Sequence, residues 1–189
     1  MRALSIDAST THIGWAVFDD DDLVAWGRLE PTKPKLNWRE RTENLAPQLD
    51  ELIETYKPEI VYQEEVPKGG SGGVITGIQL GFVQGMLYTV EKMMNNLPVI
   101  YIEVGTWRKQ LGINSGNQHR DAKKINSIRK ANELFSKYGV NLPLVFTESG
   151  AYSAAKSDDD TADALNLYAS TREKYRKPTV KFGRARKVG

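Results

Sequence analysis

Residues 3–29, ALSIDASTTHIGWAVFDDDDLVAWGRL, contain the pattern that decides the fold. Three short apolar runs cover residues 3–9, 12–18 and 23–29, and the last two are rich in the Val, Trp, Phe and Leu that favour strands. Four consecutive aspartates at 19–22 mark a turn. Strands joined by such short connections pair antiparallel. The sequence therefore predicts that the chain opens with three antiparallel strands.

The rest of the chain alternates helices with strands. Helical spacing over 38–56 precedes a strand over 59–64, and a long helix over 74–94 precedes a strand over 98–102. Further helices are expected over 106–111 with Thr106 as its N-cap, over 120–138, and over 157–175. Strands separated by helices pair parallel. We predict an α/β domain with a mixed five-stranded sheet, antiparallel first and parallel later, flanked by helices.

Composition excludes several kinds of site. The 189 residues suit one domain and include no cysteine and two histidines, His12 and His119. A disulfide framework, a thiolate metal site and a cysteine nucleophile are therefore excluded. No apolar run approaches the roughly 18 residues that cross a bilayer, and residues 1–7 reach an acid too soon for a secretory signal. We expect a cytoplasmic protein with no membrane partner.

Charge is distributed unevenly along the chain. Residues 172–189 hold eight Lys and Arg against one Glu, whereas the whole chain carries a net charge of only +2. We therefore divide the chain into a domain over 1–171 and a basic tail over 172–189. Such a tail on an acidic body favours a polyanionic partner such as nucleic acid, and a solvated tail without a partner is the alternative.

Acids stand at three places where the pattern calls for core residues. Asp7 closes the first strand, Glu64 with Glu65 beside it closes the strand over 59–64, and Asp160 and Asp163 lie on the last helix. At about 100° per residue, both helix acids border the apolar stripe that faces the sheet. Unpaired carboxylates there are costly, and a divalent cation removes the cost.

These acids favour a magnesium site. Oxygen ligands without histidine suit Mg²⁺ better than Zn²⁺, with Mn²⁺ as an alternative ion. Two ions about 4 Å apart would clamp the attacking and leaving oxygens of a phosphodiester, so the site and the basic tail together indicate a nuclease. The alternative is structural: Ser157 caps the last helix with acids in its first turn, Asp7 caps a turn, and Glu64 ends a strand.

Four motifs then resemble those of RuvC-type Holliday junction resolvases. They are LSIDAS (4–9) followed by GWAV (14–17), QEEV (63–66), LGFVQG (80–85) and DTADAL (160–165). The resemblance implies an RNase H-like fold and a homodimer that nicks both strands of a four-way DNA junction symmetrically. It implies Asp7, Glu64, Asp160 and Asp163 as catalytic, metal-binding acids that hold two ions per site. The short chain looks like a phage or mobile-element member, which would place it in the bacterial host cytoplasm.

Further residues are expected to contact DNA or to pack against another element. The expected DNA contacts are Lys68, Arg108, Lys109, Arg120, Lys123 and Lys124. Gly77, Gly81 and Gly85 line one helix face, where we expect close packing against the sheet, with a second subunit as the alternative. His12 is expected to be a strand residue without a catalytic role.

Three other functions compete with a junction resolvase. One is a broader RNase H-like nuclease acting on flaps, other branched DNA or RNA. Another is an ATP-binding domain, because residues 7–11 followed by Gly14 resemble the phosphate-binding hairpin of actin-like ATPases and sugar kinases. The third is a nucleic-acid-binding protein without catalysis.

Overall fold

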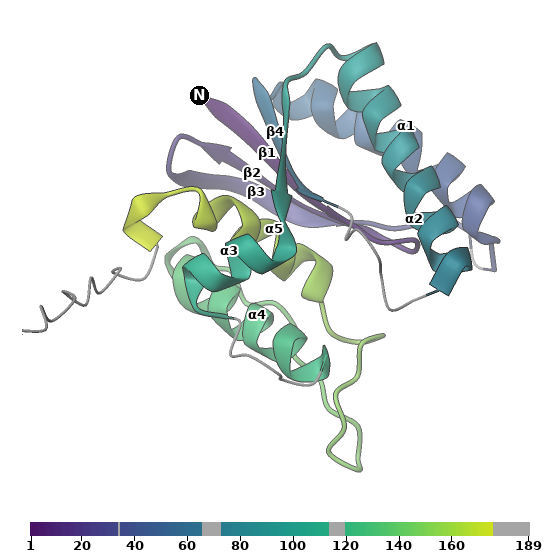
Figure 1. Cartoon of the computed structure of the whole chain (residues 1–189). Coiled ribbons are helices and arrows are strands. Elements are labelled where there is room, and N and C mark those ends of the chain that lie inside the picture. Colours follow the sequence, from purple (N-terminus) through teal and green to yellow (C-terminus); the bar gives the residue numbers. More distant parts are fainter. Residues whose placement is uncertain (34, 66–72, 114–119, 176–189) are drawn as a thin grey trace, which may run out of the picture.

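The computed structural model describes residues 1–33, 35–65, 73–113 and 120–175, and shows one sheet between two groups of helices (Figure 1). The strands are β1 (Arg2–Ala8), β2 (Ile13–Asp19), β3 (Asp22–Leu29), β4 (Ile60–Glu65) and β5 (Val99–Glu103). Their order is β3-β2-β1-β4-β5. The β1–β2 and β2–β3 pairs are antiparallel, and the β1–β4 and β4–β5 pairs are parallel. The predicted mixed five-stranded sheet is confirmed.

Helices cover both faces of the sheet. On one face lie α1 (Trp38–Tyr56), α2 (Gly73–Tyr88) and the π-helical segment η1 (Thr89–Met94) (Figure 1). On the other lie α3 (Val104–Leu111), α4 (Arg120–Phe135) and α5 (Asp159–Ser170). Short 3₁₀ turns, η2 (Ser136–Tyr138) and η3 (Glu173–Tyr175), follow α4 and α5.

The alternation of side chains along β1 decides which face each residue serves. Leu4 and Ile6 are fully buried in the core under α1 and α2. Ser5 faces the other way and donates a hydrogen bond from Oγ to the carbonyl oxygen of Ala164 at 2.7 Å, which ties β1 to α5. Because successive strand residues alternate between faces, Asp7 lies on the same face as Ser5 and α5.

Several helix ends differ from the prediction. Asp158 caps α5 by accepting a hydrogen bond from the backbone N–H of Thr161, whereas the expected cap, Ser157, accepts from the backbone N–H of Val145. Helix α3 begins at Val104, so Thr106 lies inside it. The predicted helix over 74–94 is α-helical only to Tyr88 and continues as a π-helix.

None of the described residues packs against the glycine face of α2. A Cβ added at Gly77, Gly81 or Gly85 would meet no atom within 4 Å, so the expected packing of these glycines against the sheet is wrong. Large apolar neighbours are also in solvent, with Val74 80% and Ile78 58% exposed. An apolar helix face is left uncovered within the described chain.

One helical stretch of the described residues has the length and composition of a membrane span. Over Gly73–Met94 an 18-residue window has a mean hydropathy of 1.3 and is 17% buried. The sequence-based expectation that no apolar run approaches this length is therefore wrong.

Candidate active site

Two adjacent parallel strands and one helix bring the four predicted carboxylates together. Asp7 and Glu64 lie at the carboxyl ends of β1 and β4, which pair side by side. Asp160 and Asp163 lie in the first turns of α5. Burial, followed by the charges of the other three carboxylates, raises the pKa of Asp7 well above its usual value. The four acids therefore share one electrostatic site.

A glycine in β2 allows α5 to begin at this end of the sheet. Gly14 pairs with Asp7 across β1 and β2. A Cβ at Gly14 would lie 2.1 Å from both the carbonyl carbon and the oxygen of Asp160. No side chain fits in that space, so Gly14 is what permits Asp160 to approach Asp7.

The structure separates the two adjacent glutamates of β4. Glu64 accepts a hydrogen bond from the indole Nε1 of Trp107 at 2.9 Å, on the α3 side of the sheet. Glu65 instead lines a cavity of about 410 Å³ with Gln84 and Tyr88 of the α2 side. Glu64 is thus the glutamate that joins the other acids, a choice that the sequence left open.

Arg108 lies inside the acidic site. Its Nη2 donates to Oδ2 of Asp163 at 2.6 Å, and its side chain is only 17% exposed. The hydroxyl of Ser127 donates to the other oxygen of Asp163. The guanidinium therefore neutralises a carboxylate in this arrangement, and the DNA contact expected of Arg108 stays a prediction.

A second ion pair, partly buried, lies beside the site. Lys124 forms an ion pair with Asp159, whose other oxygen accepts a hydrogen bond from the hydroxyl of Tyr152 at 2.9 Å. Asp159 is 8% exposed. Of the remaining expected DNA contacts, Lys109 is exposed and Lys123 half-buried, while Lys68 and the Arg120 side chain lie outside what the structure describes.

Sequence reasoning missed several residues of this site. His12 places Nδ1 3.7 Å from Oδ2 of Asp160, a proximity that the sequence did not indicate, and its expected lack of a catalytic role stays a prediction. Trp107 and Ser127 hold two of the carboxylates, and nothing in their local sequence marks them as site residues. Their contacts span 43 and 36 positions along the chain, so only the folded arrangement shows them.

The donor set suits a hard divalent cation, but the present side-chain arrangement does not form a complete metal site. Across residues 1–33, 35–65, 73–113 and 120–175, no group of three or more His, Asp or Glu is placed so that it could hold an ion. Carboxylate oxygens are the ligands that Mg²⁺ prefers, and a cation would relieve the repulsion among these acids. Both oxygens of Asp163 already accept hydrogen bonds, from Arg108 and from Ser127, so a cation bound to Asp163 would share these oxygens or displace a donor.

The raised pKa values predict how stability depends on pH. Burial raises the pKa of Glu64 and of Asp160 to about 7, with a further increase from Asp163 and Asp159 respectively. The folded protein therefore binds more protons than the unfolded chain between about pH 4 and 7, so stability falls as pH rises through this range.

In EDTA we expect the melting temperature to fall by at least about 3 °C from pH 5 to pH 8. Scanning calorimetry measures this, and Mg²⁺ should raise the melting temperature more at pH 8 than at pH 5. A melting temperature that rises with pH in EDTA would contradict this assignment.

The sheet order and the helices on its two faces form an RNase H-like fold. Among solved structures, the chain is similar to Thermus thermophilus RuvC in complex with a Holliday junction substrate, with a TM-score of 0.61 and 17% identity over 94% of this chain and 98% of that one. It is similar to a second structure of Thermus thermophilus RuvC, with a TM-score of 0.59 and 16% identity over 94% and 99% of the two chains. No family profile and no curated protein matches the sequence. At this identity the likeness establishes the fold, and the function must be argued from the site.

Proposed function

We propose that this protein is a metal-dependent endonuclease that resolves four-way DNA junctions by paired symmetric nicks. The observation that carries the proposal is the shared site of Asp7, Glu64, Asp160 and Asp163 at one end of the sheet. Buried acids that repel one another cost stability, which is typical of a functional site. The same fold occurs in a protein that was solved with a Holliday junction.

The four acids are the proposed ligands of two Mg²⁺ ions, with Mn²⁺ as an alternative. Such a pair supplies an activated water and stabilises the leaving oxygen of a phosphodiester. The chain's own contribution is orientation: Trp107 fixes the Glu64 carboxylate, and Ser127 fixes that of Asp163. Arg108 adds positive charge beside Asp163. Its guanidinium is proposed to bind a non-bridging phosphate oxygen of the DNA when it is not paired with Asp163.

The remaining cations are proposed to position the DNA. Lys109 and Lys123 lie on α3 and α4, the helices next to the acids, and Lys68 and Arg120 belong to the same proposal. Lys124 is proposed to contact the DNA from its position beside Asp159, with which it forms an ion pair. Contacts of this kind hold the phosphate backbone and do not read its sequence.

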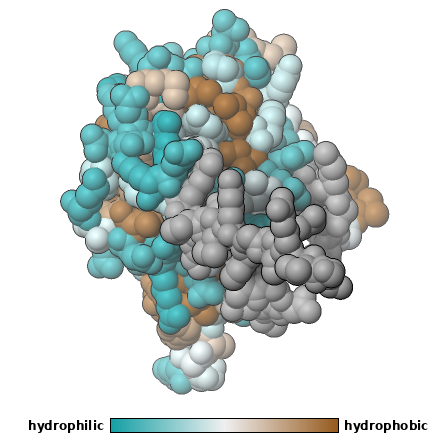
Figure 2. Space-filling view, turned by 60° about the vertical axis from the view of Figure 1, so that its left-hand side comes forward, coloured by the Kyte–Doolittle hydropathy of each residue, from teal (hydrophilic) through white to brown (hydrophobic). Residues whose placement is uncertain are grey.

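The uncovered face of α2 is proposed to pack against a second copy of the chain. Most of the coloured surface in Figure 2 is hydrophilic, with hydrophobic residues gathered in a few places. Residues 74–90, by contrast, contain no charged side chain. Glycines at every fourth position let two such helices approach closely, and a twofold interface is self-complementary. Two subunits also supply the two active sites that paired nicks require.

Changing the α2 face should separate the subunits. Ile78→Glu places a charge on this face and is expected to convert a dimer to a monomer at micromolar concentration, because a buried unpaired carboxylate is costly. Junctions would then be nicked in one strand at a time. Light scattering after gel filtration measures the mass. Val24→Glu, on the exposed edge strand β3, is the control and should stay dimeric. A monomeric wild type, or one that binds lipid vesicles through this helix, would overturn the dimer proposal.

A panel of substrates tests the choice of DNA structure. The wild-type protein in Mg²⁺ is presented with a four-way junction, a flap, a linear duplex and an RNA–DNA hybrid of matched sequence. We expect cleavage of the junction alone. Equal rates on the flap or the hybrid would replace a junction resolvase by a broader RNase H-like nuclease, and binding without cleavage would leave a DNA-binding protein.

A further inference from the structure

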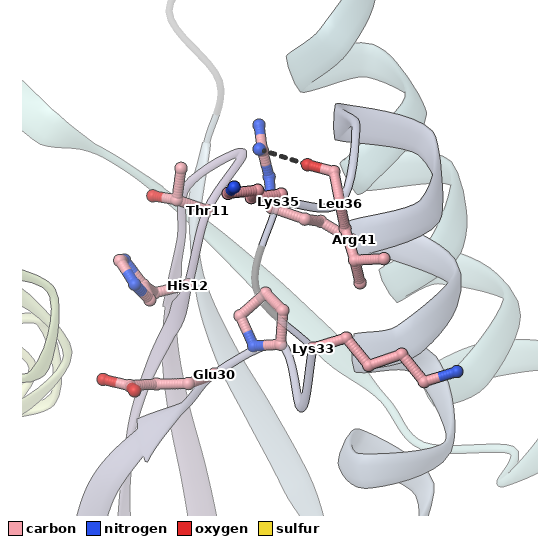
Figure 3. Close-up of a pocket in the computed structure, with 8 residues that line it drawn as sticks. Thr11, His12, Glu30, Lys33, Lys35, Leu36 and Arg41 are labelled. Atoms are coloured by element: carbon pink, nitrogen blue, oxygen red, sulfur yellow. Dashed lines mark hydrogen bonds between the residues drawn. The ribbon is translucent and has the colours of Figure 1, made fainter.

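A second polar pocket lies beside the acidic site. It encloses about 240 Å³, and the lining residues that matter for its chemistry are Thr11, His12, Glu30, Lys33, Lys35 and Arg41. Figure 3 shows Lys35 extending toward Thr11 beside the Arg41 guanidinium, and His12 and Glu30 pointing away from α1. The pocket joins the turn between β1 and β2 to the segment that precedes α1.

Arg41 is held in place without being neutralised. Its Nε donates to the carbonyl oxygen of Thr10 at 3.0 Å, and its Nη1 donates to that of Leu36 at 2.9 Å (Figure 3). Within the described part of the chain, Arg41 forms no ion pair and its Nη2 has no hydrogen-bond partner. A fixed guanidinium with an open edge is suited to bind a phosphate oxygen.

The neighbouring charges make the pocket positive. Lys33 and Lys35 are exposed and, among the described residues, neither forms an ion pair. The one carboxylate of the lining, Glu30, already accepts a hydrogen bond from Nε of Arg28 at 2.8 Å. Among the residues that the structure describes, the pocket therefore has a surplus of positive charge.

His12 connects the pocket to the acids. It lines the pocket and also lies 3.7 Å from Asp160. We propose that this pocket, through Lys35, Arg41 and the Thr11 hydroxyl, binds a backbone phosphate of the DNA strand that is being cut, close to the phosphate held by the acids. The proposal rests on the proposed function and adds a subsite that fixes the strand in register with the acids.

Removing the lysine charge tests this subsite. Lys35→Gln should weaken binding to a four-way junction about eightfold at 0.1 M salt, and should reduce the slope of log K against log salt by about 0.9, the loss of one phosphate contact. Lys57→Gln is the matched control. Both lysines are exposed and have a left-handed backbone, with φ of 63° and 49°. Lys57 lies at the opposite end of the sheet, before β4, and its variant should bind as the wild type does.

A neutral-linkage scan identifies the phosphate. Methylphosphonates, which lack the backbone charge, are placed singly on either side of the nick in an immobile junction. One position should weaken wild-type binding about eightfold and should weaken the Lys35→Gln protein clearly less, because Arg41 alone still contacts that phosphate. The subsite would be overturned if every methylphosphonate weakened junction binding equally in the wild type and in Lys35→Gln, or if Lys35→Gln bound the unmodified junction as the wild type does. Either result would leave the nuclease proposal intact. Loss of wild-type junction binding altogether would overturn both. A different result would assign the pocket to a nucleotide: Mg-ATP raises the melting temperature of the wild type but not of Lys35→Gln, and both proteins bind the junction equally.

Discussion

Replacing Asp7 by asparagine is expected to lower the rate of junction cleavage by about 10³-fold or more and to leave junction binding almost unchanged. Asp7 ends the central strand of the site, and its pKa is raised by burial and by the other three acids. An amide cannot supply the negative charge that a divalent ion needs. It also removes the repulsion among the acids, so the melting temperature in EDTA at pH 8 should be equal to or higher than that of the wild type.

The combination of lost activity and retained stability is the informative result. Single-turnover cleavage and calorimetry measure the two quantities on the same preparation. Glu54→Gln, an exposed acid of α1, is the control and should change neither. Cleavage by Asp7→Asn within tenfold of the wild-type rate would contradict a metal-binding role for Asp7.

Replacing Gly14 by alanine is expected to destabilise the fold by about 3 kcal/mol or more, equivalent to a fall in melting temperature of roughly 6–12 °C. The added Cβ would lie 2.1 Å from backbone atoms of Asp160, and backbone cannot rotate away as a flexible side chain can. Helix α5 must therefore shift away from β2, and the Asp160 carboxylate moves with it. Cleavage should fall even at temperatures where the variant remains folded.

Gly105→Ala gives the matched comparison. The nearest atom to a Cβ at Gly105 is Oε1 of Glu103 at 3.9 Å, an ordinary contact, and Gly105 lies inside α3. Alanine is favoured over glycine in a helix by up to about 1 kcal/mol, so this variant should be as stable as the wild type or more so. A Gly14→Ala protein that melts with the wild type would show that α5 does not depend on the close approach.

The elements that the sequence predicted correctly are those whose signal is local. The strands over 3–9, 12–18 and 59–64 match β1, β2 and β4 within one residue at each end, because apolar runs bounded by turns carry that information. The acids at the strand ends and on α5 could be predicted as site residues because that signal is local too. A carboxylate in an apolar pattern is conspicuous without any knowledge of the fold.

What the sequence could not show depends on partners distant in the chain. Arg108 was expected only as a DNA contact, and its pairing with Asp163 joins residues 55 positions apart. The glycine spacing of α2 indicated close packing but not its partner, and the structure leaves that face open. Gly14 was noticed only within a motif, since its role depends on a helix that begins about 145 residues later.

Mapping of the nicks on an immobile four-way junction tests the central claim most directly. Each of the four strands is labelled in turn, and the wild-type protein is compared in Mg²⁺ and in EDTA. The account predicts nicks at symmetric positions in two opposing strands, with 5′-phosphate and 3′-hydroxyl ends, and none in EDTA. Junction binding without cleavage in either Mg²⁺ or Mn²⁺, or cleavage that persists in EDTA, would contradict the assignment of Asp7, Glu64, Asp160 and Asp163 as a metal-dependent nuclease site.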